Sequence, residues 1–237
     1  MANTASIDLE LSSSQYATAA DSASTSITGD LTLEAWIKLE QLPSVAGTTF
    51  TIVAKWWSGD AKRSYQWVIS DTGNVMYFTP SDDGAGAPAA NSNTPLTAGV
   101  WTHVAVSYNA AAGSATFFVN GVADGTVTGL DTSIQNNISE LAIGSSNHQT
   151  AAAGFFDGII DDVRLWSVTK TATDILAFYK QELIGSEANL NAYWKFNNVA
   201  TDATVNANNL TLINVPVYST DVPFIGQNMT GLNSKIW

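Results

Sequence analysis

The stretch Leu31-Thr32-Leu33-Glu34-Ala35-Trp36-Ile37-Lys38-Leu39 decides the fold class, because two sets of side chains alternate along it without a break. Successive side chains of a β-strand point to opposite faces, so the entirely apolar set that begins with Leu31 lies on one face. The other face carries Glu34, Trp36 and Lys38 among its members. This pattern predicts a strand that is buried on one face only.

Similar short runs of apolar and β-branched residues recur along the chain, separated by turn residues. Asn120-Gly121 is a strong signal of a tight hairpin, because both central residues of such a turn need a positive φ. The predicted strands cover residues 51–55, 65–70, 75–78, 101–108, 114–119, 140–144, 155–166, 190–196 and 210–213. Many short strands with hairpin turns predict an all-β fold with antiparallel sheets.

One segment departs from this period and predicts a helix. Thr171-Ala172-Thr173-Asp174 is similar to a capping box, with Asp174 in place of the usual Glu or Gln. Apolar residues then recur at helical spacing, and Gly185 ends the run. We therefore expect one short surface helix near residues 172–183, packed on a sheet.

Composition excludes several function classes. The chain has 237 residues, with 9 Lys and Arg against 21 Asp and Glu, and its net charge of −12 opposes binding to nucleic acid. It contains no Cys, so disulfides and zinc–thiolate sites are excluded. No apolar run approaches the ~20 residues that span a bilayer, so membrane insertion is not expected. Residues 1–16 have no signal-peptide pattern.

Five segments carry a family resemblance in their order and spacing. They read LTLEAWIK at 31–38, WTHVAVSY at 101–108, FFVNG at 117–121, FDGIIDDVRLW at 156–166 and AYWKF at 192–196. Together they resemble the laminin-G-like jelly rolls of the concanavalin A-like lectin/glucanase superfamily. The resemblance implies a two-sheet antiparallel jelly-roll sandwich over residues 1–224, with 225–237 as a C-terminal tail or closing strand.

The superfamily resemblance leaves several functions open, since one fold hosts many functions. Its glucanase members carry a closely spaced Glu-x-Asp-x-x-Glu motif that this sequence lacks. We therefore expect a non-catalytic, lectin-like carbohydrate-binding module of a cell-surface, secreted or virion protein. The alternative is a structural or adhesive module that binds a protein partner or self-associates. A glycoside hydrolase is the least favoured hypothesis.

The candidate sugar-binding residues are a tryptophan at a strand end and polar loop residues, because a Trp face stacks on a sugar ring while amides and carboxylates bind its hydroxyls. The alternative for this tryptophan is core packing, since Trp is highly buried on average. The candidate residues are Trp57, Asp60, Asn91, Asn147 and His148.

Calcium is the one cofactor that the resemblance suggests. Pentraxin members bind Ca²⁺ at positions that match the region of Asp60 and the loop 145–149, and only Asp60 is acidic there. A single weaker site from Asp60, Asp82 and Asp83 is the remaining hypothesis, because Ca²⁺ accepts mixed oxygen ligands. The alternative for Asp82-Asp83-Gly84 is a solvated turn without a metal.

The run 155–166 contains charged residues within a predicted strand. Alternation places Asp161 on the apolar face, where a carboxylate needs hydrogen bonds, a cation or a metal. We favour pairing with backbone N–H groups or a partner side chain over a metal. Arg164 and Lys195 are the expected partners of Glu34 or Asp162. His103 is interpreted as a hydrogen-bonded histidine of the sheet, with no catalytic partner.

Overall fold

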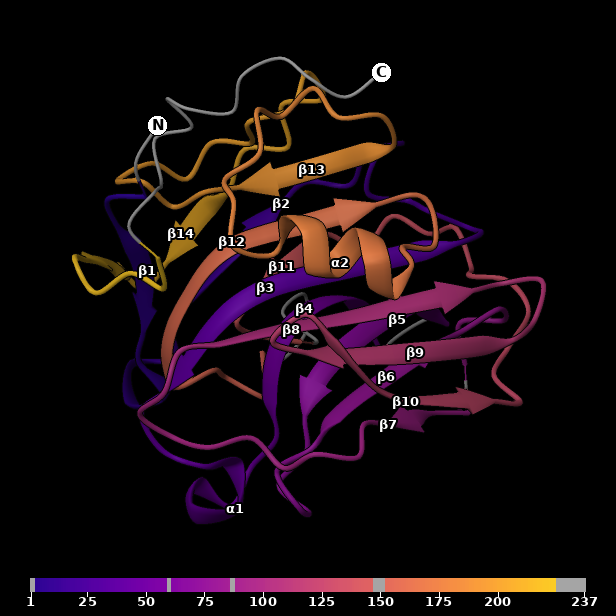
Figure 1. Ribbon diagram of the computed structural model, residues 1–237, viewed down its shortest axis with the longest axis horizontal. Helices are drawn as coiled ribbons and strands as arrows, with labels where there is room; N and C mark the ends of the chain where they lie inside the picture. Colours follow the sequence, from indigo (N-terminus) through magenta and orange to yellow (C-terminus); the bar gives the residue numbers. More distant parts are fainter. Residues whose placement is uncertain (1–2, 59–60, 86–87, 147–151, 225–237) are drawn as a thin grey trace.

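The computed structural model describes residues 3–58, 61–85, 88–146 and 152–224, and it contains two antiparallel sheets (Figure 1). Sheet A has the strand order β10-β9-β8-β3-β12-β1-β15, and β13 also pairs with β12. Its strands are β1 (Ser6–Leu9), β3 (Leu31–Leu39), β8 (Thr102–Asn109), β9 (Ser114–Val119), β10 (Val122–Thr128), β12 (Gly158–Trp166), β13 (Leu190–Trp194) and β15 (Val217–Ser219).

Sheet B has the strand order β14-β2-β11-β4-β5-β6-β7. Its strands are β2 (Tyr16–Ala19), β4 (Phe50–Trp57), β5 (Lys62–Ile69), β6 (Met76–Pro80), β7 (Ala90–Asn91), β11 (Leu141–Ile143) and β14 (Thr211–Ile213). Apolar side chains from the two sheets interdigitate in one core, which includes Leu33, Trp67, Phe78, Phe117 and Trp194. The predicted all-β, two-sheet jelly-roll sandwich is confirmed.

The helices are short. They are the 3-10 helix η1 (Leu11–Ser13) and the α-helices α1 (Pro43–Ala46) and α2 (Ala172–Phe178). No helix among the described residues is long and apolar enough to cross a lipid bilayer. Helix α2 lies in front of sheet A in Figure 1. Its predicted capping box is present: Thr171 accepts a hydrogen bond from the Asp174 backbone N–H, and Asp174 accepts one from the Thr171 N–H.

Helix α2 ends at Phe178, before the predicted limit near residue 183. The carbonyl oxygens of Phe178 and Gln181 accept hydrogen bonds from the guanidinium of Arg164 on the sheet below. The segment after Phe178 therefore turns down onto the sheet instead of continuing as a helix.

The segment after α2 covers the outer face of β3, so the prediction that β3 is buried on one face only was wrong. Trp36 on the outer face is 5% exposed, because its ring stacks on Tyr179 at 5.9 Å between centroids and its Nε1–H donates to the Tyr179 carbonyl at 2.7 Å. Thr32 and Glu34 are also buried, so Lys38 is the one partly exposed residue of the strand.

The expected orientation of Asp161 was wrong, because a β-bulge interrupts the strand. The pairing of β12 with β3 shifts between Asp161 and Arg164, and Asp162 has a positive φ of 52°. The extra residue moves Asp161 to the outer face, where it pairs with Trp36, while Val163 returns to the core. Asp161 accepts hydrogen bonds from Asn3 Nδ2 at 2.7 Å and from the Asp162 N–H, so the favoured pairing is confirmed.

A buried ion cluster of Glu34, His103, Asp162 and Arg164 lies on the outer face of sheet A, beneath the segment that follows α2. Arg164 Nη2 lies 2.5 Å from Asp162 Oδ2, and Arg164 Nη1 lies 3.6 Å from Glu34 Oε2. His103 Nε2 lies 3.3 Å from the same Glu34 oxygen. The prediction for Arg164 is therefore confirmed, whereas Lys195 Nζ donates to the Leu183 carbonyl at 2.6 Å instead. His103 is buried in this cluster, but neither of its ring nitrogens has a hydrogen-bond partner among the described residues, so the predicted hydrogen bonding of its side chain was wrong.

Candidate functional site

The outer face of sheet B carries a row of side chains across four adjacent strands. The register pairs Thr51 with Val68, Val68 with Tyr77 and Tyr77 with Asn91. These residues alternate with core residues such as Trp67 and therefore point away from the core. Period-two alternation thus places a hydroxyl, an aromatic ring and an amide side by side on an outer face.

A cleft of about 500 Å³ lies over this row, and we call it the sheet B cleft. Thr51, Gln66, Val68 and Tyr77 line it from the strands. Its walls come from three loops: residues 47–49 before β4, Ser70 and Asp71 after β5, and Ser146 with residues 153–154. The volume lies within the usual range for small-molecule sites.

Not every polar group around the cleft forms a hydrogen bond within the described protein. Thr51 Oγ1 is buried and has no hydrogen-bond partner among the described residues. A buried hydroxyl without a partner costs about 1–3 kcal/mol of stability. The loop at residue 154 can approach Thr51 closely because Gly154 has no side chain; a Cβ at this position would lie 2.8 Å from Thr51 Oγ1.

None of the predicted sugar-binding residues is among the described residues that line the cleft. Asn91 is exposed and lies beside Tyr77 at the end of the row. Asn147 and His148 lie outside the described residues, but the preceding Ser146 is part of the cleft wall, where it forms an isolated bridge with Ala153.

Trp57 is not part of the sheet B cleft. It lies at the opposite end of β4 from Thr51, about 20 Å along the strand at ~3.3 Å per residue. It is partly exposed, and the Lys62 ammonium lies 4.2 Å from its ring centroid. The neighbouring Trp56 is 8% exposed, because adjacent residues of a strand point to opposite faces. Asp60 lies outside the described residues.

The residues that sequence reasoning missed are Thr51, Gln66 and Tyr77. The alternation of side chains along the predicted strands could have indicated them, because Gln66, Val68 and Ser70 alternate with core residues along β5 and just after it. Ordinary residue types on an outer face form no motif. Only the loops from distant parts of the chain make them the floor of a cleft.

The predicted metal ligands Asp82 and Asp83 lie in a turn that their own hydrogen bonds help to fold. Asp83 Oδ1 accepts a hydrogen bond from the Ala85 N–H at 2.7 Å, and the Asp82 N–H donates to Asp131 Oδ2 at 3.2 Å. Burial, together with the negative charges of Asp82 and Asp83, raises the pKa of Asp131. This geometry fits the alternative of a solvated turn, and calcium at these residues stays a prediction.

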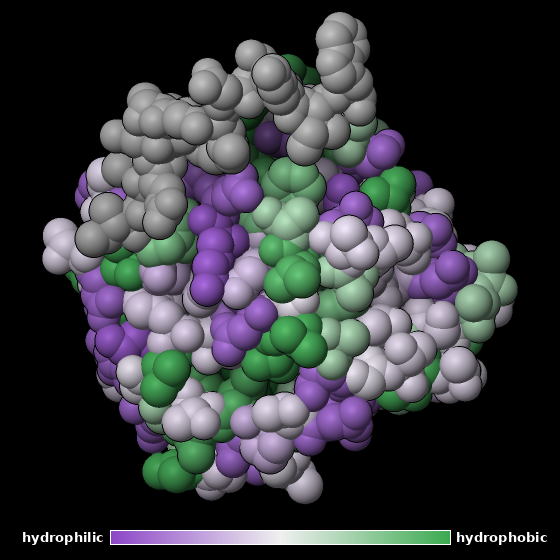
Figure 2. All heavy atoms as spheres, viewed as in Figure 1, coloured by the Kyte–Doolittle hydropathy of each residue, from purple (hydrophilic) through white to green (hydrophobic). Residues whose placement is uncertain are grey.

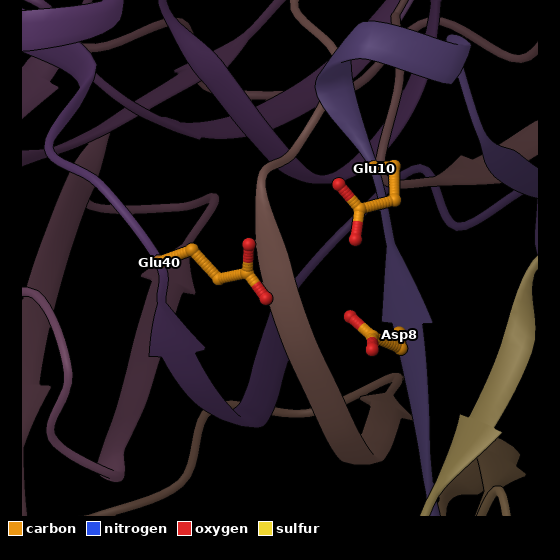
Figure 3. A group of neighbouring side chains, drawn as sticks. All are labelled: Asp8, Glu10 and Glu40. Carbon is orange, nitrogen blue, oxygen red and sulfur yellow. The ribbon is translucent and has the colours of Figure 1, made fainter.

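The described residues hold a different carboxylate group, formed by Asp8, Glu10 and Glu40 (Figure 3). One oxygen from each lies within 4.8 Å of the others, and the side chains converge from β1 and from the end of β3. Burial and the neighbouring carboxylates raise the pKa of all three groups. Hard oxygen ligands of this kind suit Ca²⁺ or Mg²⁺ chemically, and sequence reasoning did not bring these residues together.

Comparison with known proteins supports the fold. Residues 11–176 match the sequence model of a family described as the concanavalin A-like lectin/glucanases superfamily. No curated protein matches the chain. A structure named as a candidate carbohydrate-binding protein from Bacteroides ovatus superposes with a TM-score of 0.72 at 19% identity, covering 96% of this chain. The chain spans only 62% of that protein.

Two further structures share the architecture. The heptameric SAP-like pentraxin of Limulus polyphemus superposes with a TM-score of 0.59 at 11% identity, over 96% of this chain and 98% of the pentraxin. The CBM40 domain of a Ruminococcus gnavus sialidase, solved with α2,3-sialyllactose, gives 0.56 at 14% identity, over 73% of this chain and 95% of that domain. With the family match over more than half of its length, the chain belongs to the concanavalin A-like lectin/glucanases superfamily.

Proposed function

We propose that the protein is a non-catalytic carbohydrate-binding module whose glycan occupies the sheet B cleft. The observation that carries the proposal is a cleft of about 500 Å³ that combines the ring of Tyr77 with the side-chain amide of Gln66. A pyranose has apolar C–H faces and equatorial hydroxyls. An aromatic ring beside hydroxyl and amide groups complements both parts of such a ligand.

The charge of the cleft selects a neutral glycan. Among the described residues that line it there is no Lys, Arg or His, and Asp71 is the one ionisable group besides the Tyr77 phenol. The whole chain also carries a net charge of −12. A carboxylated sugar would enter this cleft without a cationic partner, so its charge would oppose binding.

The structural neighbours support the carbohydrate part of the proposal. The Bacteroides ovatus protein is named for carbohydrate binding, and the Ruminococcus gnavus domain is bound to a sialylated sugar. The described residues that line the cleft offer no cation to a sialic-acid carboxylate, so we expect the ligand to differ. A glycan-binding role fits an extracellular, cell-surface or virion location, as a module of a larger protein.

The cleft does not suit glycoside hydrolysis. That reaction commonly uses two carboxyl groups, roughly 5–9.5 Å apart, on either side of the scissile bond. The described lining residues provide one carboxylate, Asp71, which lies on a loop at the rim. A binding role without catalysis therefore accounts better for these side chains.

A panel of neutral and acidic glycans, screened with Ca²⁺ and with EDTA, tests the proposal. We expect neutral glycans to bind, and we expect Tyr77→Ala to weaken binding about tenfold through the lost stacking contact. Gln66→Ala should weaken it about two- to tenfold through a lost hydrogen bond. Tyr218→Ala, a partly exposed tyrosine on β15 of sheet A, is the matched control.

Folded protein that binds no neutral glycan refutes the proposal. Unchanged affinity in both cleft variants refutes the placement in the sheet B cleft. A requirement for Ca²⁺ would add a metal to the account, and equal binding in EDTA would remove it.

A further inference from the structure

Asp161, on the outer face of sheet A, is a buried carboxyl group without a cation. It belongs to β12, lies opposite Trp36 of β3 and is 0% exposed. Among the described residues no Lys, Arg or His forms an ion pair with it, and Arg164 pairs instead with Asp162 and Glu34. Figure 2 shows this face from outside, where hydrophilic and hydrophobic residues lie side by side over the central strands. An ionised carboxylate in such a place carries a large desolvation cost.

The charged groups that act on Asp161 are other acids. Asp162 follows it in the bulge, and Glu182 belongs to the segment after α2. The other elements packed against Asp161 offer neutral residues, Trp36 of β3 and Asn3 before β1. Burial, with the negative charges of Asp162 and Glu182, raises the pKa of Asp161 well above its usual range. These surroundings favour the neutral acid over the carboxylate.

The polar side chains around Asp161 lack a hydrogen-bond donor. Asn3 is 4% exposed, and its Oδ1 is buried without a partner among the described residues. Glu182 Oε2 is buried and unpartnered in the same way. Buried acceptors without a donor are unfavourable. A proton on Asp161 would turn one more acceptor into the donor that this group of side chains lacks.

The contact between Asn3 and Asp161 can hold that proton. Asn3 Nδ2 lies 2.7 Å from Asp161 Oδ2. O–H···O hydrogen bonds are most often about 2.7–2.8 Å long, so the distance suits one of them. A half-turn of the amide exchanges its nitrogen and oxygen, so that Asn3 Oδ1 accepts the proton of a neutral Asp161 at the same place. The half-turn also gives the buried Oδ1 the partner that it lacks.

The same group of side chains joins three segments that are far apart in the sequence. Asn197 Oδ1 accepts hydrogen bonds from the Thr4 N–H at 2.6 Å and from the Ala5 N–H at 3.3 Å. Asn197 Nδ2 donates to Glu182 Oε1 at 2.5 Å. Residues 3–5, which we call the N-terminal segment, are therefore linked to Asp161 on one side and to the segment after α2 on the other.

We propose that Asp161 holds a proton in the folded protein at neutral pH, and that this proton is a latch whose loss at alkaline pH loosens the N-terminal segment and the segment after α2. In the closed state the neutral acid donates to Asn3. In the open state the carboxylate is repelled by Asp162 and Glu182, and the network above it is strained. The latch lies on sheet A, so it does not depend on the glycan proposed for the sheet B cleft.

The direct test of the proton is the chemical shift of the Asp161 carboxyl carbon in ¹³C-labelled wild-type protein between pH 5 and pH 10. We expect the shift of a neutral acid at pH 7 and a change to the carboxylate at higher pH. A carboxylate at pH 7 overturns the proposal. A carboxyl group that stays neutral up to pH 10 contradicts the latch.

Amide hydrogen exchange of the same protein tests the loosening. The amides to follow are those of Thr4 and Ala5, with exchange rates corrected for the intrinsic effect of pH. We expect their protection to fall about tenfold or more as Asp161 ionises. The matched control is the Ala112 amide, which also donates to an Asn side chain, Asn109 Oδ1 at 2.9 Å. Equal protection of Thr4 and Ala5 before and after the titration refutes the latch.

Asp161→Asn puts a permanently neutral side chain of the same shape in this place. The raised pKa means that the folded wild type binds more protons than the unfolded chain, so its stability falls from the ordinary carboxyl range up to that pKa. The variant lacks this titration. The unfolding constant of the wild type, divided by that of the variant, should therefore rise about tenfold per pH unit in this range.

Asp82→Asn, at an exposed position, is the control for the loss of one carboxylate, and its ratio should stay nearly constant. A constant ratio for Asp161→Asn as well would overturn the inference. If Asp161→Asn does not fold, the carboxyl shift and the amide exchange of the wild type decide the question.

Discussion

Replacing Arg164 by Met should strongly destabilise the protein at neutral pH. Met has about the length of the aliphatic part of the Arg side chain, so the change removes the guanidinium and keeps the packing of that part. The Arg164 side chain is buried and lies against Asp162 at 2.5 Å and Glu34 at 3.6 Å. Its removal leaves two buried carboxyl groups without their cation.

The expected loss is about 3–5 kcal/mol at pH 7, the usual cost of leaving a buried charge uncompensated. The lost hydrogen bonds to the carbonyls of Phe178 and Gln181 would add about 1 kcal/mol each. Protonation of the two carboxyl groups that lose their cation limits the loss of stability, because burying a neutral acid costs far less free energy than burying a carboxylate.

The loss should therefore depend on pH, and the sign follows from the two carboxyl groups. Burial raises the pKa of Glu34, but Arg164, His103 and Trp166 outweigh it, so the wild-type pKa is lowered. Burial raises the pKa of Asp162 even though Arg164 opposes the shift. Without Arg164 the pKa of Glu34 rises from its lowered value and the pKa of Asp162 rises further, so the variant binds more protons folded than unfolded. Its stability then falls as pH increases above the ordinary carboxyl range, by about 1.4 kcal/mol per pH unit for each proton retained.

Urea unfolding followed by tryptophan fluorescence at pH 5 and pH 7 measures both effects. Lys38→Met is the control, because it breaks the Lys38–Asp221 pair, whose side chains are 29% and 41% exposed, and surface pairs contribute about 0–1 kcal/mol. The reasoning fails if Arg164→Met costs no more than Lys38→Met at pH 7, or if its cost is the same at both pH values.

Three further changes have specific expected outcomes. Gly158→Ala should lower the free energy of unfolding by several kcal/mol, measured by thermal unfolding, because a Cβ there would lie 2.2 Å from the Lys38 carbonyl oxygen. Gly73→Ala is the control: its φ is 83° but no atom lies near the added Cβ, so it should cost about 1–2 kcal/mol. Thr171→Ala should cost about 1 kcal/mol in urea unfolding by removing the α2 cap. Asp8→Asn should raise the urea midpoint at pH 7 and leave it unchanged near pH 3, because the raised pKa of Asp8 reflects an unfavourable ionised form; a lower midpoint at pH 7 would contradict this.

Much of the fold follows from local sequence patterns. The central strands are long enough for the period of two to be visible, and Asn120-Gly121 fixes the β9–β10 hairpin. The short edge strands β7 and β15 have two and three residues, which is too few to show an alternation. The bulge at Asp162 could not be predicted from the sequence either, because a positive φ at a residue other than glycine is stabilised by the surrounding contacts of the fold.

The candidate sites were harder to predict than the fold. A tryptophan beside an acidic turn suggested Trp57, yet the cleft lies at the other end of β4. Its floor consists of ordinary strand residues such as Gln66, and its walls come from loops about a hundred residues apart. The carboxylates of Asp8 and Glu40 meet for the same reason, since β1 and β3 both pair with β12.

The scarcity of cations bears on the kind of glycan that the sheet B cleft can take. Only 9 Lys and Arg residues oppose 21 acids, and several of them are committed to structure. Lys55 is buried against Asp21, Arg164 is held in the ion cluster, and Lys38 pairs with Asp221. Among the described residues that line the cleft there is no Lys or Arg. In so acidic a protein an anionic ligand would meet repulsion there without a compensating cation, so the charge distribution favours an uncharged glycan.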